Sequence, residues 1–204
     1  RRQFVLHYPP QADFVTRRIC GAEALLRWQD PQSGLIPPAA FLSVLESTGL
    51  ILEVGAWVIE QAALDCREWL RAGLPPVRIA VNISPVQLRQ ADFTTRFLNA
   101  TSAWSTVTAG LDVEITEGAL QGDSVNEISR LQQLRTAGTR IAIDDFGTGY
   151  SSLSRLSSMP VDTLKIDRSF VKQLPGSAQG LTLVRTVISL AHAFAMTTVA
   201  EGVE

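Results

Sequence analysis

Runs of β-branched and apolar residues alternate along the chain with longer stretches whose apolar positions recur every three or four residues. The first kind predicts strands at 3–8, 19–28, 77–84, 111–116, 140–146, 162–167 and 197–204. The second kind predicts helices at 38–49, 50–73, 85–104, 124–138, 151–156 and 181–195. Strand cores such as 77–81 and 140–143 are almost continuously apolar, which is typical of parallel strands covered on both faces. The pattern therefore predicts a parallel α/β fold.

The length and composition of the chain indicate how many domains it forms and exclude some functions. The chain has 204 residues, of which 46% are hydrophobic and 19% charged, and it contains no low-complexity segment, linker or repeat. We therefore expect one domain over residues 1–204. The formal net charge is -2 without a block of like charges, so we expect no DNA or RNA partner.

The cysteines and the chain start bear on location. Cys20 and Cys66 are the two cysteines, and they show no metal-binding spacing, which favours a reducing compartment. No run approaches the roughly 20 apolar residues of a membrane span. We expect a cytoplasmic domain. Because the chain opens inside a predicted strand, we also expect it to be a module of a longer protein, which itself could be membrane-anchored.

Polar side chains recur near the carboxyl end of the predicted strands. In a β/α barrel these ends meet at one mouth, where active sites lie. Any one of these residues could be a solvated loop residue or a helix cap. As a set they lie inside apolar strands, where a carboxylate must be paired, hydrogen-bonded or metal-bound. They are Glu23 with Arg27, Asn82, Glu114, Asp144 with Asp145, Lys165 and Glu201.

The excess of acids in this set points to metal ions. Five carboxylates exceed the charge that Lys165 and Arg27 can neutralise. Oxygen ligands favour Mg²⁺, Mn²⁺ or Ca²⁺ over a thiolate zinc site. The adjacent Asp144 and Asp145 suit a site in which one carboxylate bridges two ions and the other binds the second. Two ions about 3.5–4 Å apart are typical of in-line displacement at phosphorus.

These motifs resemble those of the EAL domain family. GAEALLRW at 21–28 contains the Glu-Ala-Leu signature, and VNIS, VEITE, DDFGTGYSSL, VDTLKIDRSF and VAEGVE follow in the family's order. The family is a bacterial phosphodiesterase module that linearises cyclic di-GMP to pGpG. The resemblance implies an α/β fold, a modified TIM (β/α)8 barrel with an antiparallel first strand. It also implies a helix and a last strand beyond residue 204, so we expect the C-terminal part of the barrel to be missing from this chain.

The resemblance further implies two Mg²⁺ or Mn²⁺ ions and a role for each site residue. The ligands of one ion match Glu23, Asn82, Glu114 and Asp144, and those of the other match Asp144, Asp145 and Glu201. Lys165 matches the lysine that contacts the attacking water. We expect catalytic roles for Lys165, Glu201 and Glu23. The implied reaction is two-metal-assisted in-line attack of a metal-bound water or hydroxide.

The remaining matches concern substrate and partners. Arg27 matches an arginine that contacts a substrate phosphate, with Leu25 and Leu26 beside it against the guanine or ribose. Glu117 matches the glutamate that anchors the DDFGTG loop. The expected ligand is cyclic di-GMP. We also expect a homodimer, and fusion to sensory or GGDEF-type modules.

Three alternatives compete with an active phosphodiesterase. The first is a non-catalytic cyclic di-GMP receptor, favoured by Pro9, which stands where the family has a substrate-binding glutamine and offers no side-chain hydrogen bond. The second is another metal-dependent barrel hydrolase, which the number of ordered motifs disfavours. The third takes Asp145-Phe146-Gly147 as a kinase magnesium motif. It fails because the chain has no Gly-rich nucleotide loop and no His-Arg-Asp segment.

Overall fold

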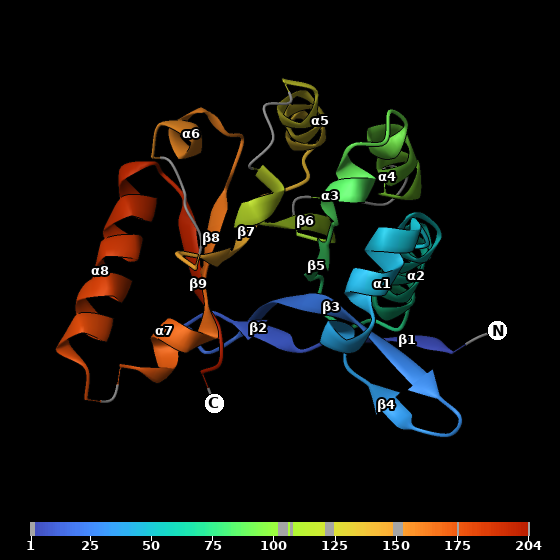
Figure 1. The fold of residues 1–204 in the computed structure, drawn as a ribbon, viewed down its shortest axis with the longest axis horizontal. Helices are drawn as coiled ribbons and strands as arrows, with labels where there is room; N and C mark the ends of the chain where they lie inside the picture. Colours follow the sequence, from blue (N-terminus) through green and yellow to red (C-terminus); the bar gives the residue numbers. More distant parts are fainter. Residues whose placement is uncertain are drawn as a thin grey trace.

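The computed structural model consists of one mixed sheet flanked by helices (Figure 1). It describes residues 3–101, 106, 108–120, 125–148, 153–174 and 176–203. The strands are β1 (Phe4–His7), β2 (Pro10–Ala12), β3 (Ile19–Asp30), β4 (Gly34–Ile36), β5 (Arg78–Asn82), β6 (Gly110–Thr116), β7 (Ile141–Phe146), β8 (Thr163–Ile166) and β9 (Thr197–Ala200). The α-helices are α1 (Leu42–Thr48), α2 (Ile51–Arg71), α3 (Pro85–Leu88), α4 (Phe93–Thr101), α5 (Val125–Thr136), α6 (Leu153–Ser158), α7 (Arg168–Lys172) and α8 (Ala178–Ala193). Two 3-10 helices are η1 (Pro38–Ala40) and η2 (Glu117–Leu120).

The strand order is β1-β3-β5-β6-β7-β8-β9, and all neighbours from β3 onward are parallel. Both β1 and β2 run antiparallel to β3. The predicted α/β fold with an antiparallel first strand is therefore confirmed, and the arrangement is that of a modified TIM barrel. Because the strands are parallel, their carboxyl ends share one end of the sheet.

The prediction of one continuous helix over 85–104 is wrong, because α3 and α4 are separate helices. Leu88 and Phe93 are both buried in the core. In one continuous helix these two positions would lie about 140° apart around the axis, because each residue turns about 100°. The break between them lets both side chains face the sheet. Residues 102–104 of the predicted helix, residue 124, residues 151–152 and residue 204 lie outside the described residues.

Four elements escaped prediction because each is short, and one of them is the four-residue 3-10 helix η2. Strands β2 and β4 have three residues each and pair with the two ends of β3, which extends to Asp30. Helix α7 has five residues and begins after Asp167, whose side chain accepts a hydrogen bond from the backbone N–H of Ser169. Such segments carry too few apolar positions for a period to show.

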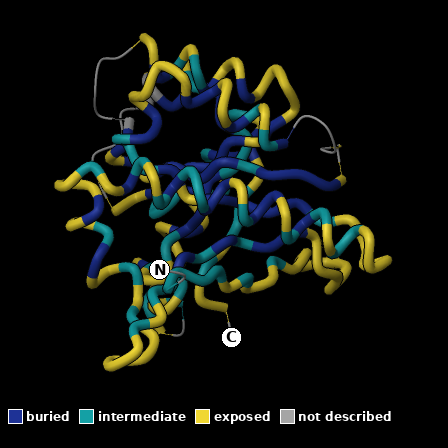
Figure 2. The backbone as a smooth tube through the Cα atoms, turned by 90° about the vertical axis from the view of Figure 1, so that its right-hand side faces the viewer, coloured by how far each residue is buried: buried dark blue, intermediate teal, exposed yellow. Residues whose placement is uncertain are grey.

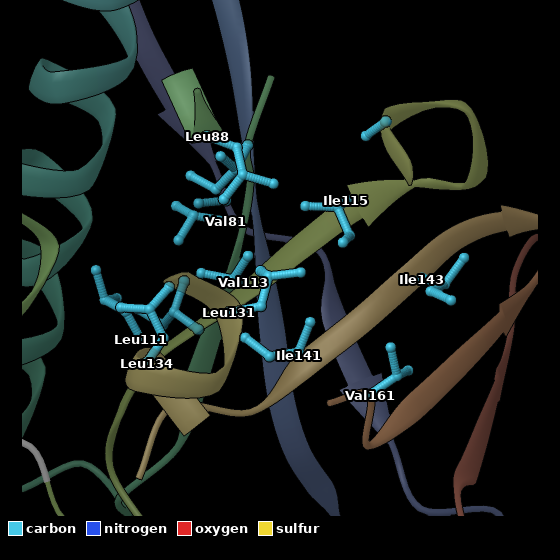
Figure 3. Close-up of a cluster of buried hydrophobic side chains, with 14 of the residues drawn as sticks. Val81, Leu88, Leu111, Val113, Ile115, Leu131, Leu134, Ile141, Ile143 and Val161 are labelled. Atoms are coloured by element: carbon cyan, nitrogen blue, oxygen red, sulfur yellow. The ribbon is translucent and has the colours of Figure 1, made fainter. Parts of the chain in front are cut away.

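The core lies between the sheet and the surrounding helices. Figure 2 shows buried backbone along the strands and exposed backbone on the outer faces of the helices. In Figure 3, Leu131 and Leu134 of α5 lie among the outward side chains of the central strands, with Val113 and Ile141 beside them. Burying each such side chain stabilises the fold by about 1.5–3 kcal/mol.

A buried ion pair joins the amino ends of the central strands. Arg78 at the start of β5 is 5% exposed, and its guanidinium donates to Asp112 of β6. It also donates to the backbone oxygens of Thr106, Leu111 and Gly138. Asp112 Oδ1 in turn accepts from the N–H of Arg140, just before β7. This network fixes three strands at the end of the sheet away from the polar set.

No single helix in the described part of the chain is long and apolar enough to cross a membrane. The helices α1 and α2 pass that test only as a pair, with a bend of 120° between them.

Candidate metal centre

Lys165 lies at the centre of a cluster of carboxylates. Its strand, β8, alternates so that Leu164 and Ile166 join the hydrophobic core while Lys165 faces the inside of the curved sheet. The side chain of Lys165 is 1% exposed. Its Nζ lies within salt-bridge distance of four acids that lie in or directly after four other strands: Glu114 at 2.7 Å, Glu201 at 2.7 Å, Asp144 at 3.0 Å and Glu23 at 3.1 Å.

Asn82 joins the same cluster. It lies opposite Glu114 in the β5–β6 register, and its Nδ2 donates to Glu23 Oε1 across 2.7 Å. The amide therefore holds the carboxylate of Glu23 from one side while Lys165 holds it from the other. The predicted convergence of these strand-end residues is observed.

The carboxylates of Asp144 and Asp145 face the same ligand group although the two residues are consecutive. In a regular strand they would point to opposite faces. The β7–β8 register is broken between Ile143 and Phe146, and Asp145 has a left-handed φ of 53°. Asp tolerates that conformation better than most residues, and its N–H donates to Asp144 Oδ1 at 3.0 Å. The irregularity lets both carboxylates face the same group of ligands.

The cluster is electrostatically deficient in positive charge. Among the described residues, every salt bridge made by these acids comes from Lys165. Burial raises the pKa of Glu114 from 4.5 to about 8, with Lys165 opposing and Glu23 adding to the shift. Burial also raises the pKa of Glu201 and of Asp145. Burial by itself would favour a neutral Lys165, but the surrounding carboxylates hold its pKa above the usual range.

The donor set fits divalent cations. Two groups of three acids offer oxygen atoms that all lie within 4.8 Å of one another: Glu23, Glu114 and Asp144, and Asp144, Asp145 and Glu201. Asp144 belongs to both groups, as a bridging ligand would. Oxygen-only ligands are those that Mg²⁺ and Mn²⁺ prefer, and their charge would offset the deficit.

Glu117 contacts the loop that follows β7. Its side chain is 6% exposed, and Oε2 accepts a hydrogen bond from the N–H of Gly147 at 3.0 Å. This contact connects the start of η2 to the residue two positions after Asp145. Residues 149–152 of the DDFGTGYSSL motif lie outside the described residues.

The expected substrate contacts divide between the two faces of β3. Leu25 and Arg27 share the strand face of Glu23 by alternation, and Arg27 Nη1 donates to the carbonyl of Leu26 at 2.9 Å. Leu26 is 9% exposed and belongs to the core cluster that includes Phe41. Leu26 therefore packs under the helices instead of lining the site beside Leu25, which corrects the expectation for it.

Two further residues contribute to the centre in ways that the motifs did not reveal. The carbonyl of Pro9 accepts from the N–H of Glu23 at 3.1 Å, so it helps fix the backbone there. Asp167 follows Lys165 by two positions, and its charge adds to the raised pKa of Asp145. The spacing of Asp167 from Lys165 was the available signal, because alternate strand residues share a face.

Comparison with known proteins gives consistent matches over the whole chain. The family model for the EAL domain matches residues 1–204. The chain is 41% identical over 204 residues to the bifunctional diguanylate cyclase/cyclic di-GMP phosphodiesterase MucR of Pseudomonas aeruginosa, covering 100% of this chain and 30% of that protein. It is 38% identical to the cyclic di-GMP phosphodiesterase PdeR of Escherichia coli, covering 99% of this chain and 30% of that protein.

Solved structures agree with this fold. The PaMucR phosphodiesterase in complex with c-di-GMP superposes with a TM-score of 0.92 at 41% identity, covering 100% of this chain and 82% of that one. The EAL enzyme Bd1971, in its cAMP- and cyclic-di-GMP-bound form, gives 0.91 at 35% identity, covering 100% and 56%. The chain spans about a quarter to a third of the length of the curated relatives it matches.

Proposed function

The chain belongs to the EAL domain family, and on that premise we propose that it hydrolyses cyclic di-GMP to linear pGpG with two divalent cations, Mg²⁺ or Mn²⁺. The observation that carries this proposal is Asp144, a member of both oxygen-ligand groups around one buried lysine. Relatives named as cyclic di-GMP phosphodiesterases, MucR and PdeR, support the substrate and the reaction type.

We assign the ligands to the two ions by their grouping. Glu23, Glu114 and Asp144 would hold one ion together with the Asn82 side chain, and Asp144, Asp145 and Glu201 would hold the other. When bound, such ions lower the charge of the phosphodiester and the pKa of an attacking water.

The chain's own residues would orient the reacting groups. Lys165, with its pKa held high by the acids around it, is a hydrogen-bond donor in this geometry. It would hold Glu23 and Glu114 in place through two of its three N–H donors and direct the third at a water lying between the ligand groups. Glu201 lies 2.7 Å from the same Nζ, and we assign it to the second ion and to orienting that water.

Substrate binding would use Arg27 and Leu25. One guanidinium nitrogen of Arg27 is engaged by the Leu26 carbonyl, which fixes the side chain. A guanidinium has five N–H donors, so others can form charge-assisted bonds to a phosphate oxygen. Leu25, on the same strand face, would contact the guanine or ribose.

A cyclic di-GMP receptor without turnover is the second candidate. Pro9 favours it, because a proline offers a substrate no side-chain hydrogen bond. For either function we propose a cytoplasmic domain that forms a homodimer and is fused to sensory or GGDEF-type modules. The small share of each longer relative that the chain covers supports the fusion.

The test is turnover of cyclic di-GMP in Mg²⁺ and in Mn²⁺, with EDTA as the metal-free control. Metal-dependent release of pGpG, abolished by Glu23→Ala, would establish the phosphodiesterase. Binding of cyclic di-GMP without release would favour the receptor. If the protein neither binds cyclic di-GMP nor releases pGpG, both candidates are wrong.

A further inference from the structure

Helix α7 lies between two chain segments that carry candidate ligands. It follows β8, the strand of Lys165, and lies beside the end of β9 (Figure 1). Gly147 comes two positions after Asp145, and Gly202 directly follows Glu201. Side chains of α7 contact both glycines, so one short helix touches both segments of the ligand group formed by Asp144, Asp145 and Glu201.

Phe170 packs against the backbone of Gly147. A Cβ added at Gly147 would lie 3.1 Å from Cε2 and 3.5 Å from Cζ of the Phe170 ring. The φ of Gly147 is +95°, which disfavours other residues there. The Gly147 N–H also donates to Glu117. The loop after Asp145 is therefore held by a ring contact in addition to the hydrogen bond.

Arg168 covers Gly202 with the aliphatic part of its side chain. A Cβ at Gly202 would lie 2.3 Å from Cγ and 2.7 Å from Cδ of Arg168. The preceding residue, Glu201, donates its N–H to the carbonyl of Ile166 at 3.1 Å. Glu201 is thus fixed on one side by β8 and followed directly by a residue in contact with the Arg168 methylenes at the surface.

The start of α7 is itself fixed to β8. Asp167, immediately after the strand, accepts hydrogen bonds from the N–H and hydroxyl of Ser169. This cap sets the direction in which the helix leaves the strand. The cap therefore fixes α7, which carries Arg168 and Phe170, relative to β8, which carries Lys165.

Building on the proposed function, we propose that α7 is a positioning element that holds Asp144, Asp145 and Glu201 in register for one divalent cation, through Phe170 against Gly147 and Arg168 against Gly202. The physical reason is that ligand oxygens on separate strand ends must be fixed closely to bind an ion together. Residues that orient metal ligands typically change metal affinity about 10–100-fold when altered.

The experiment compares two truncations with two matched controls. Phe170→Ala and Arg168→Ala remove the contacts, whereas Phe170→Leu keeps apolar bulk and Arg168→Met keeps the aliphatic stem without the charge. Each protein is titrated with Mn²⁺ in the absence of substrate, and its thermal midpoint is measured in EDTA. We expect both alanine variants to weaken one of two Mn²⁺ sites by about tenfold or more, with the leucine and methionine variants close to the unchanged protein. Lys172→Ala, on the exposed side of α7, should change neither site.

The outcomes separate this inference from the proposed function. If the unchanged protein binds two Mn²⁺ ions and releases pGpG, but both alanine variants keep both affinities, the positioning role is wrong while the function stands. If the unchanged protein binds no Mn²⁺, the proposed function fails, and exchange of the Gly147 amide proton in EDTA then decides the role of Phe170. Phe170→Ala should speed that exchange by about tenfold, and an unchanged rate would overturn the inference.

Discussion

Lys165 Nζ lies 2.7 Å from Glu114 Oε2, and the side chains of these residues are 1% and 2% exposed. The pair is buried, yet Lys165 also contacts three further acids. One cation shared in this way cannot neutralise all its partners, and the predictions below depend on that imbalance.

Removing the lysine charge should destabilise the metal-free protein. In Lys165→Met the four neighbouring carboxylates lose their salt-bridge partner, and breaking a buried pair costs about 3–5 kcal/mol. Urea unfolding in EDTA measures the change, with Lys172→Met as the exposed control, which should lie within about 0.5 kcal/mol of the unchanged protein. Equal stabilities for the two variants would contradict the central role of Lys165.

The stability of the metal-free protein should fall as pH rises from about 5 to about 8. The pKa of Glu114 is raised in the fold from 4.5 to about 8, so the folded state binds more protons than the unfolded state in that window. This contribution is fully present below the lower value and is lost as pH rises through the upper one. Saturating Mn²⁺ should remove the slope, because ion binding replaces the proton. Glu114→Gln should reduce the slope in EDTA, and an unchanged slope in that variant would assign it to other groups.

The contact between Glu117 and Gly147 should matter for activity more than for folding. Glu117→Ala removes the acceptor, frees the loop after Asp145, and should lower kcat by about 10–100-fold. Glu117→Gln keeps an oxygen acceptor and should retain more activity than the alanine variant. Circular dichroism checks that both fold. Full activity of a folded Glu117→Ala would show that the anchor is unnecessary.

Arg27 should act on binding of the phosphodiester. Arg27→Ala loses a charge-assisted contact of about 1.5–3 kcal/mol, so we expect KM for cyclic di-GMP to rise by about 10–100-fold. Leu26→Met, on the opposite face of β3, is the matched control and should leave KM unchanged. Initial-rate kinetics measure both. An unchanged KM in Arg27→Ala would remove this residue from the site.

The ion pair at the other end of the sheet should affect stability alone. Arg78→Met leaves the partly buried Asp112 without its partner and should cost up to about 3–5 kcal/mol. The Mn²⁺ affinity of the folded variant should match that of the unchanged protein, because Arg78 lies at the start of β5 and Asn82 at its end. A selective loss of Mn²⁺ binding would mean that the two ends of the sheet are coupled.

The sequence by itself determined the α/β alternation, the strand-end polar set and the family. Apolar runs of strand length and helical periods are local patterns, so they can be recognised in the sequence without knowledge of the fold. An acid inside a run such as AVNIS or IAIDD also signals a site locally, because it must find a partner when buried.

Only the tertiary structure decided which face each residue takes and what surrounds it. The left-handed φ of Asp145 and the broken register of β7 bring two consecutive acids to one side, against the alternation of a regular strand. Leu26 turned out to pack in the core. The contacts of α7 with Gly147 and Gly202 join segments far apart in sequence. Such relationships depend on distances between strands, which local sequence patterns do not specify.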